Sequence, residues 1–231
     1  MRTLNRGISL ALLVSGLLAG CGGGGGGGST SAPTTGATTT FPLTSAVSAF
    51  SQTSHDYSLT SSSGSNTYGL QFNMTPGTTL QTFEGQLAST MAESLIVRQN
   101  GAVVDTETGT SYFQVSPYTA FGYISTSGVY EVFSQPQPLP ASATVGQSGA
   151  LGTIKVYTDS TKTSLAATIT EVWSLQADTA TTAWGCENGS EVFTNGSPTV
   201  GIATCYKVDT SGNVLALRLT LAVNGQSLTF Q

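Results

Sequence analysis

Charged side chains are scarce in this chain of 231 residues, of which 8 % are Asp, Glu, Lys or Arg. Seven basic residues stand against twelve acidic ones, which gives a formal net charge of −5. The basic residues form no cluster that would attract the phosphates of nucleic acid or anionic lipid headgroups. We therefore expect no nucleic-acid partner.

Histidine and cysteine are scarce as well, with one histidine (His55) and three cysteines (Cys21, Cys186 and Cys205). A single histidine excludes a His-rich metal site, and the absence of a Cys-x-x-Cys pair excludes the common dithiol redox motif. The sequence thus predicts no metal site and no cofactor.

The apolar run from Ile8 to Leu18 is about half the ~20 residues that a membrane-spanning helix needs. It follows Arg2 and Arg6 and ends at small residues before Cys21. A charged start, a short apolar core and a small-residue cleavage site are typical of a secretory signal peptide. Cleavage without lipidation would leave Cys21 as an odd thiol in an oxidising compartment.

Leu18-Ala19-Gly20-Cys21 resembles the bacterial lipobox. The resemblance implies that Cys21 is diacylated, becomes the first residue of the mature protein and anchors it to a membrane by lipid. Gly22 stands where an Asp would favour retention at the inner membrane. By resemblance to that sorting rule, we expect an outer-membrane lipoprotein that faces the periplasm or the cell surface.

Seven consecutive glycines, Gly22–Gly28, follow the lipobox and lead into a Ser/Thr-rich stretch. Such a composition buries no core and forms a flexible linker. We therefore divide the chain into a signal peptide (1–21), a tether (22–42) and a single domain (43–231).

Alternating apolar residues and regularly spaced turns predict an all-β domain. Strands are expected over these ranges: 68–74, 95–97, 112–115, 121–124, 129–133, 151–157, 165–175, 180–186, 201–208 and 214–223. Asn100-Gly101 predicts a tight hairpin. The pattern is typical of an antiparallel meander that is closed as a barrel or folded as a sandwich.

One short helix is expected at the start of the domain. Leu43, Val47 and Phe50 recur at helical spacing, and Thr44 is suitably placed to cap the helix.

Cys186 and Cys205 remain once Cys21 is assigned to lipid, and an oxidising compartment favours a disulfide between them. In the chain-entropy model, closing a loop of about twenty residues contributes roughly 3 kcal/mol to stability. The alternative is a pair of buried free thiols.

Residues 57–231 resemble uncharacterised exported lipoproteins of Gram-negative bacteria. The likeness lies in the cysteine–glycine tether, in Leu139-Pro140-Ala141-Ser142-Ala143 and in Cys205-Tyr206-Lys207-Val208-Asp209. It implies no particular activity.

Several residues are candidates for catalytic or ion-binding groups. His55, beside Asp56, could activate a serine, although a polar loop residue is the simpler interpretation. Asp105-Thr106-Glu107, expected in a loop, offers oxygen ligands for Ca²⁺ but lacks the spacing of a calcium loop. Gly146-Gln147-Ser148-Gly149 only approximates a nucleophile elbow.

Trp173 and Trp184 could form a sugar-binding platform, but packing within a sheet is the usual role of Trp. With no catalytic constellation, we expect a non-enzymatic, membrane-anchored envelope protein with a binding or structural role and an unknown protein or small-ligand partner. The first alternative is a carrier of an apolar ligand inside a β-barrel or half-barrel. The second, a hydrolase based on paired carboxylates, has no residue pair to support it.

Overall fold

The computed structural model describes residues 39–223 and 226–231. The expectations for the signal peptide, for lipidation of Cys21 and for nearly all of the tether lie outside these residues. The same holds for Asn224-Gly225, which the sequence places between the last two strands.

The described elements are almost all strands. In chain order they are β1 (Thr40–Phe41), α2 (Leu43–Phe50), β2 (His55–Ser63), β3 (Asn66–Pro76), β4 (Gln81–Phe83), β5 (Gln86–Gln99), β6 (Ala102–Gln114), β7 (Thr119–Ser125), β8 (Tyr130–Ser134), β9 (Ala143–Thr144), β10 (Ser148–Tyr157), β11 (Leu165–Ala177), β12 (Thr182–Phe193), β13 (Val200–Asp209), β14 (Val214–Val223) and β15 (Gln226–Phe230).

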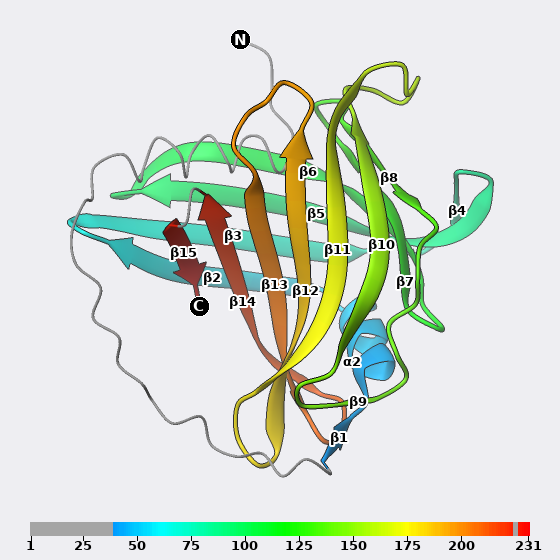
Figure 1. The fold of residues 1–231 in the computed structure, drawn as a ribbon, viewed down its shortest axis with the longest axis vertical. Helices are drawn as coiled ribbons and strands as arrows, with labels where there is room; N and C mark the ends of the chain where they lie inside the picture. The colour runs from blue at the N-terminus through cyan, green and yellow to red at the C-terminus, as the bar shows by residue number, and fades with distance from the viewer. Residues whose placement is uncertain (1–38, 224–225) are drawn as a thin grey trace.

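The all-β prediction is confirmed, and the sheet curves into a nearly closed barrel. Twelve antiparallel strands pair in the order β15-β14-β13-β12-β11-β10-β8-β7-β6-β5-β3-β2. Figure 1 shows these strands wrapped around a common interior. The two edge strands meet where the backbone N–H groups of Thr60 and Gln231 each donate to the other residue's carbonyl at 3.2 Å.

Each long strand presents alternate residues to the interior and to the outside. On β14, for example, Leu217 and Leu221 are buried, whereas Arg218 between them stacks over the outer Trp184. Successive side chains of a strand point to opposite faces, and residues paired in the register point to the same face. The separation into inner and outer residues therefore continues from strand to strand around the barrel. The inner apolar residues join into one large core that includes residues of β2, β3, β5, β10–β15.

The expected hairpin at Asn100-Gly101 is confirmed, because both residues have positive φ (50° and 84°) and join β5 to β6. Asparagine and glycine tolerate this conformation, which the tightest hairpin turns require at both central positions.

Helix α2 lies at one end of the barrel (Figure 1). Its buried face carries Leu43, Val47 and Phe50, the residues whose spacing predicted it. Thr44 is not the cap, which corrects the prediction. Pro42 precedes the first turn, and the Thr44 hydroxyl donates to the carbonyl of Leu139 at 2.7 Å instead. The helix is therefore fastened to the 135–147 connection.

A short arm built from β4 and the start of β5 extends from the barrel (Figure 1). Phe83 stacks on Tyr112 and Tyr130, with ring centroids 4.5 and 5.4 Å apart. Glu84 accepts a hydrogen bond from the Tyr130 hydroxyl at 2.6 Å and pairs with Lys162 at 2.8 Å. These contacts hold the arm against the outer face.

Candidate functional site: the interior of the barrel

The interior of the barrel contains a partly open cavity of about 220 Å³. Its wall is mainly apolar and aromatic, with side chains from strands all around the barrel. Thr204, Leu217 and Leu219 line it on one side, and Met91 and Phe113 on another. A concave, largely apolar space with a few polar groups is the usual form of a small-molecule site.

Helix α2 closes the cavity at one end. Val47 and Phe50 belong to the cavity wall, and Phe50 packs with Met91 and Phe113. The Ser48 hydroxyl donates to the carbonyl of Val115, in the connection between β6 and β7. The helix therefore forms part of the cavity wall.

Glutamates interrupt the apolar wall. Glu93, Glu131, Glu171 and Glu187 line the cavity from β5, β8, β11 and β12. No Lys, Arg or His is among the lining residues in the described part of the chain. The wall thus combines apolar surface with acidic groups of one charge sign.

Two further glutamates lie on the inner face. Glu107 is buried on β6 opposite Leu95, and the Tyr123 hydroxyl donates to its carboxylate at 3.4 Å. The Tyr123 ring crosses Gly109, where an added Cβ would come within 2.4 Å of that ring. Gly109 therefore makes room for the tyrosine that reaches Glu107.

Glu191 is the most deeply buried of the glutamates, at 1 % exposure on β12. Its register partners are Ile169 and Val200, both apolar. Neither carboxylate oxygen has a hydrogen-bond partner among the described residues. Burial of an unpaired carboxylate is costly, so the protonated form is favoured.

Burial and mutual repulsion shift the inner acids. Burial, and secondly the charge of Glu93, raise the pKa of Glu187 to about 7. Burial, and secondly the charge of Glu131, raise the pKa of Glu191 to about 8. Glu93 also accepts a hydrogen bond from the Ser111 hydroxyl. Near neutral pH the interior therefore holds protons that ordinary glutamates would have released.

The two cysteines lie on the opposite, outer face of the barrel. Cys186 and Cys205 are directly opposed on β12 and β13, and their sulfur atoms are 2.15 Å apart, a disulfide distance. The Arg218 guanidinium lies 3.6 Å from the Cys205 sulfur and stacks over Trp184 at 4.5 Å. The disulfide therefore links the neighbouring strands β12 and β13 on the face opposite the glutamates.

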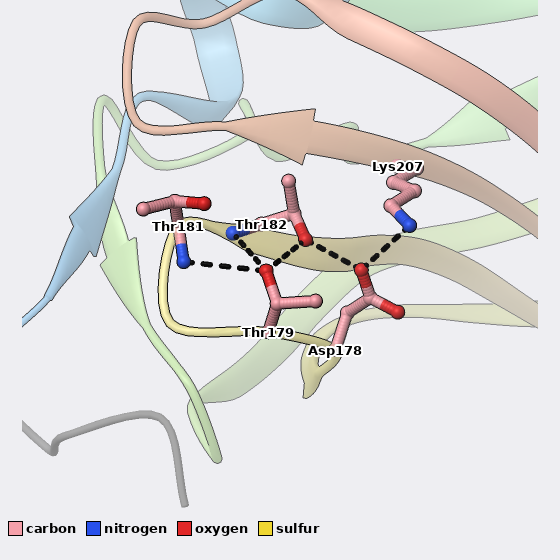
Figure 2. Close-up of polar contacts among 5 residues, drawn as sticks. All are labelled: Asp178, Thr179, Thr181, Thr182 and Lys207. Carbon is pink, nitrogen blue, oxygen red and sulfur yellow. Dashed lines mark hydrogen bonds and ion pairs between the residues drawn. The ribbon is translucent and has the colours of Figure 1, made fainter. Parts of the chain in front are cut away.

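A polar cluster beside the disulfide closes the turn between β11 and β12 (Figure 2). Asp178 pairs with Lys207 at 2.8 Å and accepts a hydrogen bond from the Thr182 hydroxyl. The Thr179 hydroxyl oxygen accepts the backbone N–H groups of Thr181 and Thr182 at 3.3 and 3.1 Å. These contacts fasten the turn to β13 through Lys207.

The candidate catalytic residues His55 and Ser148 form no common site. His55 begins β2, stacks on Phe50 at 3.9 Å between ring centroids and contacts the carbonyl oxygen of Phe50 at 2.9 Å. Ser148 begins β10, with no following helix to make a nucleophile elbow. His55 thus contacts Phe50 at the end of helix α2, and Ser148 pairs with Ser174 at the start of β10.

The expectation of a loop at Asp105-Thr106-Glu107 is wrong, because all three residues lie within β6. Alternation turns the side chain of Thr106 away from those of its neighbours, so the triplet cannot surround one ion. In residues 39–223 and 226–231, no group of three or more His, Cys, Asp or Glu side chains is arranged to hold a metal.

The two tryptophans are on different faces and form no common platform. Trp173 packs inside with Leu139 and Leu151, whereas Trp184 lies outside under Arg218. Among the described residues, no helix is both long and apolar enough to span a membrane.

Comparison with known proteins adds no functional assignment: no family model matches this chain, and no curated protein or solved structure is significantly similar to it.

Proposed function

We propose that the protein is a non-enzymatic binding protein that holds a small, largely apolar ligand inside its barrel. The observation that supports this role is the 220 Å³ cavity in the interior, with its mainly apolar wall. Small barrels are filled by side chains, whereas wider ones enclose ligand cavities. Twelve strands make a barrel wide enough to leave such a space despite the inserted helix α2.

The proposed location follows from the N-terminal residues. The lipobox-like Leu18-Ala19-Gly20-Cys21 supports a lipid anchor in the outer membrane, and the glycine-rich tether supports a barrel held close to that membrane. In this arrangement the protein binds its ligand at the envelope and remains anchored there.

A fluorescent apolar probe tests the cavity directly. N-phenyl-1-naphthylamine, which is uncharged at pH 7, should become brighter on entering the barrel. Thr204→Phe puts a larger side chain into the cavity wall and should weaken probe binding at least tenfold.

The matched control is Thr170→Phe, the same change at an exposed position of β11. It should leave probe binding unchanged. Equal binding to both variants and to the unaltered protein, with all three folded by circular dichroism, would show that the probe sits outside the barrel and refute the proposal.

A further inference from the structure

Glutamate is distributed unequally between the two faces of the barrel. Of the seven glutamates, six lie on the inner face and one, Glu84, is in the outer arm. The six inner ones are Glu93, Glu107, Glu131, Glu171, Glu187 and Glu191. Five of the basic residues fall in the described part of the chain, and none of them lines the cavity.

The basic residues have outer partners. Lys162 pairs with Glu84, Lys207 pairs with Asp178, and Arg218 contacts Gln176 at 3.1 Å. The Lys155 ammonium donates to the outward-facing Thr168 hydroxyl at 3.4 Å, and Arg98 is exposed. Among the described residues, the cavity lining therefore contributes four carboxyl groups and no cationic side chain.

The inner acids are close enough to repel one another. Tyr118, which is deeply buried, has its pKa raised by burial and by the charges of Glu187, Glu93 and Glu171. Glu187 lies beside Trp173 and Thr204 in the pairing register, at the cavity wall. Three carboxyl groups from separate strands thus line the cavity within electrostatic reach of Tyr118.

Glu191 gives an independent indication. Its side chain is 1 % exposed on the inner face, and both oxygens lack a hydrogen-bond partner among the described residues. Its cross-strand neighbour Ile169 lines the cavity. Glu131, whose charge raises the pKa of Glu191, lines the cavity as well. A buried acceptor without a donor costs stability unless something else supplies the donor.

We propose that the ligand is an organic cation: a small amine whose apolar body fills the cavity and whose ammonium group is bound by the inner carboxylates. The inference rests on the proposed function and deepens it. The apolar wall would bind the hydrocarbon part, and Glu93, Glu171 and Glu187 would supply the charge and the hydrogen-bond acceptors. A charge buried in an apolar site is stable when it is paired, which a cationic ligand would achieve.

Three compounds with the same naphthalene body separate charge from shape: 2-(2-naphthyl)ethylamine, 2-ethylnaphthalene and 2-naphthylacetate. Each would be titrated calorimetrically into the full-length protein at pH 7, and also against bound N-phenyl-1-naphthylamine. We expect the amine to bind at least tenfold more tightly than the neutral compound, and the carboxylate to bind most weakly.

Amine binding should also release protons, because Glu187 must ionise to pair with the ammonium group. The groups facing Glu187 are Glu93, Glu171, Tyr118 and Tyr206. Titration in two buffers of different ionisation enthalpy measures this release, which the neutral compound should not produce.

Glu187→Gln, alone and combined with Glu93→Gln, should reduce the preference for the amine to less than threefold while leaving the neutral compound bound. Glu84→Gln, in the outer arm, is the matched control and should preserve the full preference. Circular dichroism before titration checks that each variant is folded, and the single variant serves if the double one is not.

Equal binding of all three compounds, abolished by Thr204→Phe, would overturn the cationic ligand and leave the proposed function intact. Amine binding that Thr204→Phe does not weaken would place the site outside the barrel and overturn the inference. Failure of every compound and of the fluorescent probe to bind would refute the proposed function as well.

Discussion

The inner and outer faces of this barrel differ in the way they handle charge. On the outer face, two acids form ion pairs: Glu84 with Lys162 and Asp178 with Lys207. On the inner face, acids lie near other acids: the charge of Glu93 raises the pKa of Glu187, and the charge of Glu131 raises the pKa of Glu191. A sheet built only for stability would have apolar residues at these inner positions. This difference is the basis of our proposal that the interior binds a ligand.

Two neighbouring residues of β12 should show the largest contrast between the faces. Phe193→Ala removes an inner side chain that is 6 % exposed, and we expect a loss of about 3–5 kcal/mol in the free energy of unfolding. Val192→Ala, at 55 % exposure on the outer face of the same strand, should cost less than about 0.5 kcal/mol. Urea unfolding measures both, and similar losses would mean that the assignment of faces on β12 is wrong.

The outer disulfide should have the next largest effect. Replacing both Cys186 and Cys205 by Ser should destabilise the domain by about 3 kcal/mol, because the unfolded chain is no longer constrained. Thermal unfolding with and without reductant measures this loss. Reductant should lower the melting temperature of the unaltered protein and leave that of the double variant unchanged. A native protein that reacts with thiol reagents before reduction would contradict the bond.

The inner acids should make stability depend on pH. The pKa values of Glu187 and Glu191 rise from 4.5 to about 7 and about 8 in the folded state, so the folded state binds more protons in between. The free energy of unfolding should therefore fall as pH rises from about 5 to 8, by on the order of 1–3 kcal/mol.

A matched pair of variants locates the source of this dependence. Glu187→Gln should make the pH profile between pH 5 and 8 shallower and leave the part that comes from Glu191. Glu84→Gln should not, because its hydrogen bonds with Lys162 and Tyr130 lower the pKa of Glu84 and move its titration to more acidic pH. Denaturant melts across this range measure both profiles, and a stability that rose with pH would be inconsistent with buried, protonated carboxyls.

The outer polar cluster should have the smallest effect. Lys207→Ala removes the ion pair with Asp178 shown in Figure 2 and a cation–π contact with Trp184. Partly exposed pairs of this kind contribute less than about 1 kcal/mol. A shift in melting temperature as large as that of the disulfide variant would show that the outer face contributes more than its charges suggest.

The fold was largely predictable where the inner positions are apolar. The helix at residues 43–50, the Asn100-Gly101 hairpin and the strand Val214–Val223 follow from regular spacing and from turn chemistry. Closure as a barrel, chosen over a sandwich, depends on the distant contact between Thr60 and Gln231, which no local pattern encodes.

The acidic residues of the candidate site were not predictable from the apolar pattern of the strands. Glu107 lies within a strand read as a loop, and Glu187 and Glu191 lie beyond the predicted end of a strand at Cys186. Glutamates at inner positions break the apolar alternation that identifies a strand. Polar β2 was missed similarly, because Ser and Thr occupy much of it. The available signal was the even spacing of Asp105 from Glu107 and of Glu187 from Glu191, which places each pair on one face of a strand.

The proposed ligand is an amine that binds inside the barrel among the inner carboxylates. A crystal structure with a ring-brominated 2-(2-naphthyl)ethylamine would locate it, because anomalous scattering identifies the position of the bromine. We expect a bromine peak within the cavity and an ammonium group within hydrogen-bond distance of Glu187, Glu93 or Glu171. A fully bound compound with its bromine on the outer face, or with its amine directed away from all three carboxylates, would show that the inner carboxylates do not bind the amine.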